Sequence, residues 1–229
     1  MNKELIIIRH ARSLYNIGES KSLDSSLSGF GHRQAKNVGI FIADGGLKEK
    51  DHKFDLNNSK LFVSPYLRTL QTTRCIIEEN PHLNVEIAPE IGEYVNHTIY
   101  PIVHVNPKNE TYPDFDWGVG EVHSYNLDHH DDEWFLDTLS KFYEELPEKS
   151  IVVSHGLPCA TLLEVATSIN PIVPEWDFSI SNASITWIKN GKLLWRGREV
   201  YHEDFYSPSE RRKSSEFSKV DYFDLDVED

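Results

Sequence analysis

The sequence predicts a three-layer α/β fold, in which helices cover both faces of a mostly parallel central sheet. Short apolar runs typical of buried strands occur at 5–8, 61–63 and 151–153. Segments with helical periodicity lie between and after these runs, and such alternation is typical of parallel sheets. With 229 residues, the chain is long enough to bury a substantial core without a disulfide or metal to stabilise it.

The first strand is expected at Leu5–Ile8, a wholly apolar and largely β-branched run that suits a central strand buried on both faces. A helix is expected after Ser28. Apolar residues recur there at spacings of three and four and form one face: Ala35, Val38 and Ile42. Gly45 and Gly46 then supply a signal for the helix to end.

The second strand is expected at Leu61–Val63. Ser64 and Pro65 follow at once and predict a helix with Ser64 as its N-cap and Pro65 as its first residue. Ile151–Val153 is expected to form the third strand. A helix led by Pro158 is expected after it.

Two further elements complete the predicted core. A helix is expected from Asp131, with apolar residues that step by four, three and four along one face: Phe135, Leu139, Phe142 and Leu146. Near the C-terminus, the strands 185–188 and 193–196 flank Asn190-Gly191, a pair typical of tight hairpin turns.

The strand and helix pattern disappears between Glu93 and about Glu133, where Pro, Asn, His, Tyr and Asp dominate. We interpret 94–133 as an insertion that shapes the substrate pocket of a single domain over 1–206. Residues 207–229 are rich in charged residues and serine, and we expect a solvated tail there.

Composition restricts the classes of partner. The 23 basic and 37 acidic residues give a net charge of −14, which argues against nucleic acid and anionic membranes as partners. The longest aliphatic run near the N-terminus is too short to span a membrane, and two cysteines, Cys75 and Cys159, suggest a reducing compartment. We therefore expect a cytoplasmic protein. The net charge taken alone is also unfavourable for a phosphate ligand.

Polar side chains follow all three predicted central strands. Arg9 and His10 end the first strand, Arg68 lies on the first turn of the helix after the second, and His155 follows the third. Because the carboxyl ends of parallel strands meet at one edge of a sheet, these side chains should lie close together. Guanidinium groups bind phosphate bidentately, and a neutral imidazole can attack phosphorus. Phosphoryl transfer through histidine without a metal fits this set best.

Four segments, in order, resemble the motifs of the histidine phosphatase superfamily, whose members are also called phosphoglycerate mutase-like. Residues 5–16 resemble its strand followed by Arg-His-Gly, a variable residue, Thr or Ser, two variable residues and Asn. Residues 27–35, 64–72 and 153–156 resemble its three later motifs. The resemblance implies the phosphoglycerate mutase-like αβα sandwich and an activity on phosphate esters.

The resemblance also implies roles for individual residues. His10 would be the nucleophile that becomes phosphorylated. Arg9, Arg68 and His155 would form the phosphate pocket, His155 as part of the catalytic set, and Asn16 would add a hydrogen bond.

The proton donor in this family is usually a glutamate about 25 residues beyond the second arginine. That position falls on Glu93, 25 residues after Arg68, while Glu90 directly follows Pro89 and is the weaker candidate. A general acid must be protonated at neutral pH, so we expect burial to raise the pKa of Glu93. A solvated loop acid is the alternative reading of this residue.

Three features depart from the family pattern or compete with it. Ala11 stands in place of the usual Gly, which predicts a slightly tighter pocket. Arg12 stands where Glu or Gln is common and is either a rim contact for a second anionic group of the substrate or part of a surface salt bridge. The run 128–133 contains residues that bind metals, but acids suit the first turn of the helix expected there, so we expect no metal.

We therefore expect a metal-independent phosphomonoesterase that acts on a small phosphorylated metabolite through a phosphohistidine and needs no cofactor. The Arg-His-Tyr-Gly run that follows the glutamate in phosphoglycerate mutases is absent, since Tyr94-Val95-Asn96-His97 stands there. A phosphoglycerate-type phosphomutase and a catalytically silent module that binds a phosphorylated ligand are the alternatives. The sequence predicts no particular oligomeric state.

Overall fold

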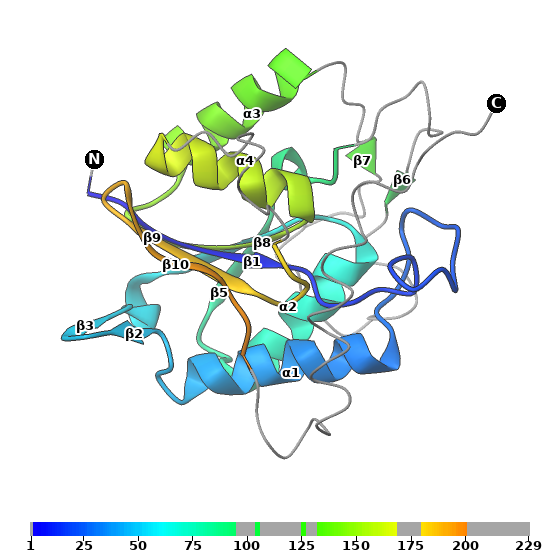
Figure 1. Cartoon of the computed structure of the whole chain (residues 1–229), viewed down its shortest axis with the longest axis horizontal. Coiled ribbons are helices and arrows are strands. Elements are labelled where there is room, and N and C mark those ends of the chain that lie inside the picture. Colours follow the sequence, from blue (N-terminus) through cyan, green and yellow to red (C-terminus); the bar gives the residue numbers. More distant parts are fainter. Residues whose placement is uncertain (1, 95–103, 106–124, 127–131, 169–179, 201–229) are drawn as a thin grey trace.

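The computed structural model describes residues 2–94, 104–105, 125–126, 132–168 and 180–200. Its centre is a six-stranded sheet with the strand order β10-β9-β1-β8-β4-β5 (Figure 1). The strands of this sheet are β1 (Glu4–Arg9), β4 (Lys60–Val63), β5 (Asn84–Ile87), β8 (Lys149–Ser154), β9 (Ile185–Lys189) and β10 (Lys192–Arg198). The helices are α1 (Gly29–Ala43), α2 (Leu67–Glu79), α3 (Asp132–Glu145) and α4 (Gly156–Thr167).

Shorter elements lie outside the central sheet. The pairs β2–β3 and β6–β7 are two-stranded and antiparallel. One 3-10 turn, η1, precedes β4, and a second, η2, follows β5. Their bounds are β2 (Lys48–Glu49), β3 (His52–Lys53), β6 (His104–Val105), β7 (Tyr125–Asn126), η1 (Leu56–Asn58) and η2 (Pro89–Ile91).

The sheet is mostly parallel, as the sequence predicts. β8 pairs in parallel with both β1 and β4, and β4 pairs in parallel with β5. The hairpin β9–β10 adds two strands at one side, with β9 antiparallel to β1. The helices α1 and α2 cover one face and α3 and α4 the other, which confirms the predicted three-layer sandwich (Figure 1).

Alternate residues of β1 belong to two separate cores. Ile6 and Ile8 pack on the side of α1 and α2, while Leu5 and Ile7 pack on the side of α3 and α4. All four side chains are at most 2% exposed, and each buried aliphatic side chain contributes about 1.5–3 kcal/mol. Because both faces of β1 are covered, residues 5–8 have no exposed position, which explains their unbroken apolar run.

The predicted limits of α1 are confirmed. Ser28 caps the helix, because its Oγ accepts a hydrogen bond from the backbone N–H of Gly31 at 3.0 Å. The helix ends at Ala43, and Gly45 has a φ of +72°, a conformation that favours glycine. α1 also packs closely against α2, since a Cβ added at Gly39 would lie 2.6 Å from the carbonyl oxygen of Cys75.

Two predicted helix starts are wrong by two residues each. Ser64 is not an N-cap, because α2 begins only at Leu67 and the Asp24 carboxylate accepts the Leu67 N–H at 2.6 Å. α4 begins at Gly156 rather than at Pro158. A proline is tolerated as third residue of a helix, where the N–H of any residue lacks an acceptor within the helix.

The remaining predictions for the core hold, with one omission. The expected face of α3 is buried: Phe135, Leu139, Phe142 and Leu146. Asn190 and Gly191 have φ values of 51° and 74°, as the hairpin turn between β9 and β10 requires. The edge strand β5 was not predicted, because its four residues alternate polar and apolar over too short a stretch to stand out.

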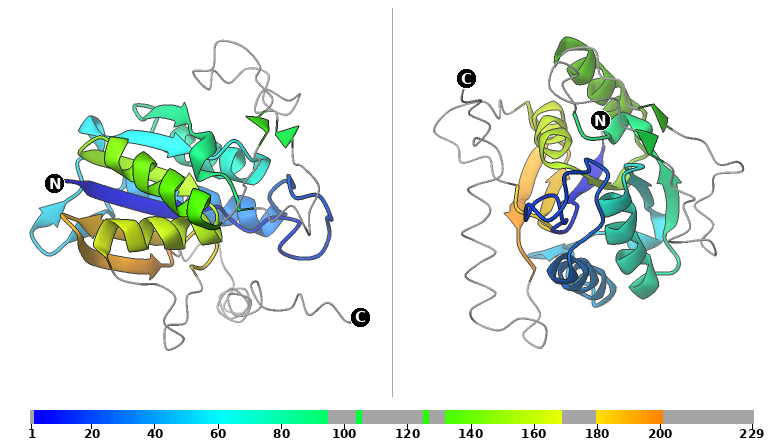
Figure 2. Two further views of the ribbon diagram at one scale, coloured as in Figure 1. Left: turned by 90° about the horizontal axis from the view of Figure 1, so that it is seen from above. Right: turned by 90° about the vertical axis from the view of Figure 1, so that its right-hand side faces the viewer.

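Most of 94–133 and all of 207–229 lie outside the described residues, so the insertion and the tail remain predictions. Within the described part, no helix has the length and apolar character that crossing a membrane requires. The right-hand view of Figure 2 looks toward the edge of the sheet where the loop after β1 lies, between α4 and the α1–α2 pair.

Candidate active site

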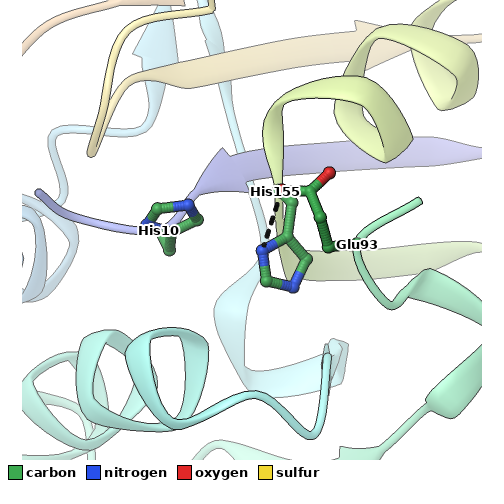
Figure 3. Close-up of side chains that lie close together, drawn as sticks. All are labelled: His10, Glu93 and His155. Carbon is green, nitrogen blue, oxygen red and sulfur yellow. Dashed lines mark ion pairs between the residues drawn. The ribbon is translucent and has the colours of Figure 1, made fainter. Parts of the chain in front are cut away.

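The carboxyl ends of β1, β4 and β8 bring the predicted residues together. Arg9 is paired with Ser154 in the parallel register, and the His10 N–H donates to the Ser154 carbonyl at 2.8 Å. His155 directly follows Ser154, so the two imidazole rings lie side by side, with their centroids 5.2 Å apart (Figure 3). The three strand ends thus converge as expected.

The tautomer of His10 follows from its contacts. Nδ1 lies 2.8 Å from the carbonyl oxygen of Ala11, and a carbonyl only accepts, so Nδ1 carries the proton of the neutral ring. The lone pair is then on Nε2, which accepts a hydrogen bond from Arg68 Nε at 3.3 Å. Burial, followed by the charges of Arg68 and Arg9, lowers the pKa of His10 well below its usual value. His10 is therefore neutral at pH 7, with its lone pair on Nε2.

Two buried guanidinium groups flank His10. Arg9 and Arg68 are both 4% exposed. Arg9 Nη1 donates to the carbonyl of Ile180 at 2.7 Å, and Arg68 Nη1 donates to the carbonyl of Leu23. Backbone carbonyls orient these groups without neutralising their charge, so the pocket holds two positive charges beside His10. Such a pair suits a phosphate group.

Glu93 lies beside His155 (Figure 3). Its Oε2 atom is 3.5 Å from Arg68 Nη2 and 3.5 Å from His155 Nδ1. Burial raises its pKa above the usual value, although Arg68 and Arg9 act in the opposite direction. Glu90, the weaker candidate, is exposed on the 3-10 turn η2. The geometry thus favours Glu93 as the acid of the site.

Asn16 lies in the loop after β1 and helps to hold it. Its Oδ1 atom accepts hydrogen bonds from the Ser13 N–H at 3.1 Å and from Ser13 Oγ at 2.9 Å. Asn182 Nδ2 donates to the carbonyl of His10 at 3.0 Å and lies 3.4 Å from the same Oδ1. A contact from Asn16 to phosphate, which the resemblance implies, stays a prediction.

Arg12 lies where the loop after β1 meets the start of α1. Its guanidinium carbon is 5.8 Å from the centre of the Phe30 ring, and that of Arg33 is 5.6 Å from the same ring. The Arg12 carbonyl accepts from Ser28 N at 2.9 Å and Ser28 Oγ at 3.0 Å. A Cβ added at Gly31 would lie 2.0 Å from that carbonyl oxygen. These contacts fix the backbone of Arg12 near the pocket.

Several residues support the site without having been predicted to do so. Thr72 Oγ1 accepts the Ala11 N–H at 3.0 Å and donates to the Arg68 carbonyl at 2.7 Å. These two hydrogen bonds connect the loop after β1 to α2. Ser154 Oγ donates to the Ile91 carbonyl at 2.6 Å and anchors the segment that carries Glu93. Thr72 is the last residue of the motif 64–72 and could be identified from the sequence, but its hydrogen bond with Ala11 could not.

Three side chains of the site also have ligand atoms at a spacing that suits a metal ion. Among the described residues, one atom each of His10, Glu93 and His155 lie within 4.8 Å of one another. The charges of Arg9 and Arg68 oppose a cation there and favour an anion. Of the run 128–133, considered from the sequence as a metal site, residues 128–131 lie outside the described residues.

Comparisons with known proteins agree with this geometry. The sequence pattern of the histidine phosphatase superfamily (branch 1) matches residues 5–200. Curated protein sequences give no significant match.

Solved structures share the fold at low sequence identity. The ecdysone phosphate phosphatase from Bombix mori, in complex with tungstate, is 10% identical with a TM-score of 0.59, over 90% of this chain and 96% of that one. A functionally characterised open reading frame product from Mycobacterium tuberculosis is 16% identical with a TM-score of 0.53, over 88% and 100%. A phosphoserine phosphatase variant from Entamoeba histolytica, in complex with phosphoserine, is 18% identical with a TM-score of 0.50, over 84% and 95%.

Proposed function

Because the chain belongs to the histidine phosphatase superfamily, we propose that it is a metal-independent phosphomonoesterase. It hydrolyses a small phosphorylated metabolite through a phosphohistidine intermediate. The observation that carries this proposal is the buried, neutral His10, whose Nε2 lone pair points toward the Arg68 guanidinium. A nucleophile, an anion pocket and an acid with a raised pKa therefore share one site.

In the first step, His10 Nε2 attacks phosphorus and forms a P–N bond while the P–O bond to the alcohol breaks. Arg68 Nε, which donates to His10 Nε2 in the free protein, transfers its hydrogen bond to a phosphate oxygen. Glu93 gives its proton to the leaving oxygen, so the alcohol departs neutral. The raised pKa of Glu93 keeps more of this carboxyl protonated than in a solvated glutamate.

In the second step, a water molecule replaces the alcohol. The Glu93 carboxylate takes a proton from this water, the water oxygen bonds to phosphorus, and the P–N bond breaks. Inorganic phosphate leaves, with His10 neutral and Glu93 protonated again. Each group thus returns to its initial state without a metal or a cofactor.

Arg9, Arg68, His155 and Asn16 bind the phosphoryl group in this proposal. The two guanidinium groups stabilise the charge on its oxygens, and this charge is spread over three oxygens in the transition state. Their backbone carbonyl partners hold them in place before the substrate arrives. The pocket is therefore organised in advance, which is the condition for strong electrostatic stabilisation.

Arg12 extends the cationic region to the rim of the pocket, where Phe30 and Arg33 accompany it. We assign it a contact with a second anionic group of the substrate. Arg12→Ala should therefore raise KM for esters that carry a carboxylate or a second phosphate and leave p-nitrophenyl phosphate unaffected. Equal effects on both kinds of ester would contradict this assignment.

The decisive experiment measures hydrolysis of p-nitrophenyl phosphate by protein purified in EDTA. We expect activity in EDTA and none in the His10→Ala variant. Activity that requires added zinc or magnesium would refute the metal-independent mechanism, and absence of activity on a panel of phosphorylated metabolites would favour a silent binding module. Transfer of phosphate between positions of phosphoglycerate faster than its release would instead identify a mutase.

A further inference from the structure

Ser64, which the sequence suggested as a helix cap, contacts the ring of His155 instead. Its Oγ atom lies 2.8 Å from His155 Nε2. We propose that Ser64 is a positioning residue that fixes His155 in the tautomer with its proton on Nδ1. The effect on turnover rests on the proposed function, whereas the tautomer itself does not.

The contact between Ser64 and His155 is buried, and backbone hydrogen bonds hold Ser64 in place. Ser64 and His155 are both 0% exposed. The Ser64 N–H donates to the Val153 carbonyl at 3.1 Å, and the Ser64 carbonyl accepts a hydrogen bond from Thr69 Oγ1 at 2.8 Å. The hydroxyl is therefore held between β4 and α2, opposite the imidazole, and water does not compete for it.

The direction of the hydrogen bond follows from the available partners. Within the described part of the chain, His155 Nε2 is the hydrogen-bond partner recorded for Ser64 Oγ. If Nε2 donated its proton to Oγ, the hydroxyl proton would be buried without an acceptor, which is unfavourable. The hydroxyl therefore donates and Nε2 accepts. In the neutral ring, the proton must then be on Nδ1.

The orientation of the ring gives this tautomer its importance. Tyr66 packs edge-on against the His155 ring, with centroids 4.8 Å apart, and His10 lies 5.2 Å from it on the pocket side. His155 Nδ1 faces the pocket, 3.5 Å from Glu93 Oε2 (Figure 3). An N–H at this position donates to an anion, while the other tautomer presents a lone pair that repels a phosphate oxygen. Ser64 thus makes His155 a hydrogen-bond donor toward the phosphate.

The first test is spectroscopic and needs no substrate. In ¹⁵N-labelled wild-type protein, long-range ¹H–¹⁵N NMR correlations of His155 should give a protonated Nδ1 and an unprotonated Nε2 above the pH at which the ring titrates. In Ser64→Ala, the signals should move toward a mixture of the two tautomers. A wild-type ring protonated on Nε2 would overturn the proposal, whether or not the protein is a phosphatase.

The second test is kinetic and uses a matched control. Ser64→Ala should lower kcat/KM for p-nitrophenyl phosphate by about 10- to 100-fold, by analogy with the loss of a residue that orients a metal-bound histidine. Ser150→Ala is the control, because Ser150 is 1% exposed, lies at the opposite end of β8 and donates to the Pro147 carbonyl at 3.1 Å. It should leave both the tautomer and kcat/KM unchanged.

These two tests separate the inference from the proposed function. A wild-type protein without phosphatase activity but with the predicted tautomer would refute the function and support the inference. An active wild-type protein in which Ser64→Ala leaves the tautomer and kcat/KM unchanged would refute the inference and leave the function standing.

Discussion

Replacing Arg68 with alanine tests the site most directly, because its guanidinium contacts both His10 and Glu93. Nε donates to His10 Nε2 at 3.3 Å, Nη2 lies 3.5 Å from Glu93 Oε2, and Nη1 donates to the Leu23 carbonyl. The group is 4% exposed, so water cannot substitute for it without rearrangement. Arg68→Ala therefore removes a charge-assisted donor that is already aimed at the position of the phosphate.

The expected loss follows from the role of this donor. Deleting one preorganised donor to a developing negative charge costs about 2.7–4 kcal/mol, which is a decrease of about 10²- to 10³-fold in kcat. Arg68 supplies a full charge as well as a hydrogen bond, so we expect an effect at or above this range. Arg68→Lys keeps the charge but loses the planar, bidentate geometry, and should recover only part of the rate.

The same substitution should move the pH dependence in a defined direction. The charge of Arg68 lowers the pKa of both His10 and Glu93. Activity requires His10 without its proton, which sets the rising limb, and Glu93 with its proton, which sets the falling limb. Removing the positive charge raises both pKa values, so both limbs and the optimum move to higher pH in Arg68→Ala. Arg68→Lys should keep an optimum near that of the wild type.

The assay is kcat/KM for p-nitrophenyl phosphate across the pH range in which carboxyl groups and imidazoles titrate. Arg74→Ala serves as the control, since Arg74 lies on the same helix but forms a half-exposed salt bridge with Glu78 at 2.8 Å. This variant should match the wild type. A loss of less than about tenfold in Arg68→Ala, or an optimum at lower pH, would refute the assigned role of Arg68.

Three further outcomes are expected. Glu93→Gln should lower kcat by about 10²- to 10⁴-fold for alkyl phosphates, measured as phosphate release. The loss should be much smaller for p-nitrophenyl phosphate, because its leaving group needs no proton. Equal losses for the two substrates would exclude Glu93 as the acid. Mass spectrometry of alkali-quenched protein should detect one phosphoryl group on wild type during turnover and none on His10→Ala. Gly39→Ala should lower stability in urea by about 1–3 kcal/mol, because its Cβ would lie 2.6 Å from the Cys75 carbonyl oxygen, whereas Gly29→Ala, with open space at its Cβ, should not destabilise the protein.

The sequence predicts those parts of the molecule in which local pattern and tertiary environment agree. The run Leu5–Ile8 is apolar because both faces of β1 are covered, so the pattern identifies the strand and its central place together. Arg9 and His10 follow it directly, and the edge-of-sheet rule then places them with Arg68 and His155. That these four residues lie together could thus be predicted without coordinates.

Partners that are distant in sequence could not be predicted in this way. Ser64 has the local appearance of an N-cap, but Asp24 supplies the cap of α2 from another loop, at Leu67. The Ser64 hydroxyl is thereby available to His155, 91 residues away. A serine near a helix start can form a hydrogen bond with the N–H groups of that helix or with a distant side chain, and the local sequence does not distinguish the two. The pairing of β4 with β8 decides between them, because it places Ser64 beside His155.

The net charge of −14 and the cationic pocket act over different distances. At physiological ionic strength, interactions between exposed charges are largely screened beyond about 8 Å, whereas buried charges are screened much less. A phosphate beside Arg9 and Arg68, each 4% exposed, therefore responds mainly to these two charges and to the neutral state of His10. Outside the pocket, the acidic surface repels a phosphate dianion weakly. In the proposed phosphatase, we therefore expect the pocket to control binding, and the overall charge to favour departure of the product and to oppose binding of extended polyanions.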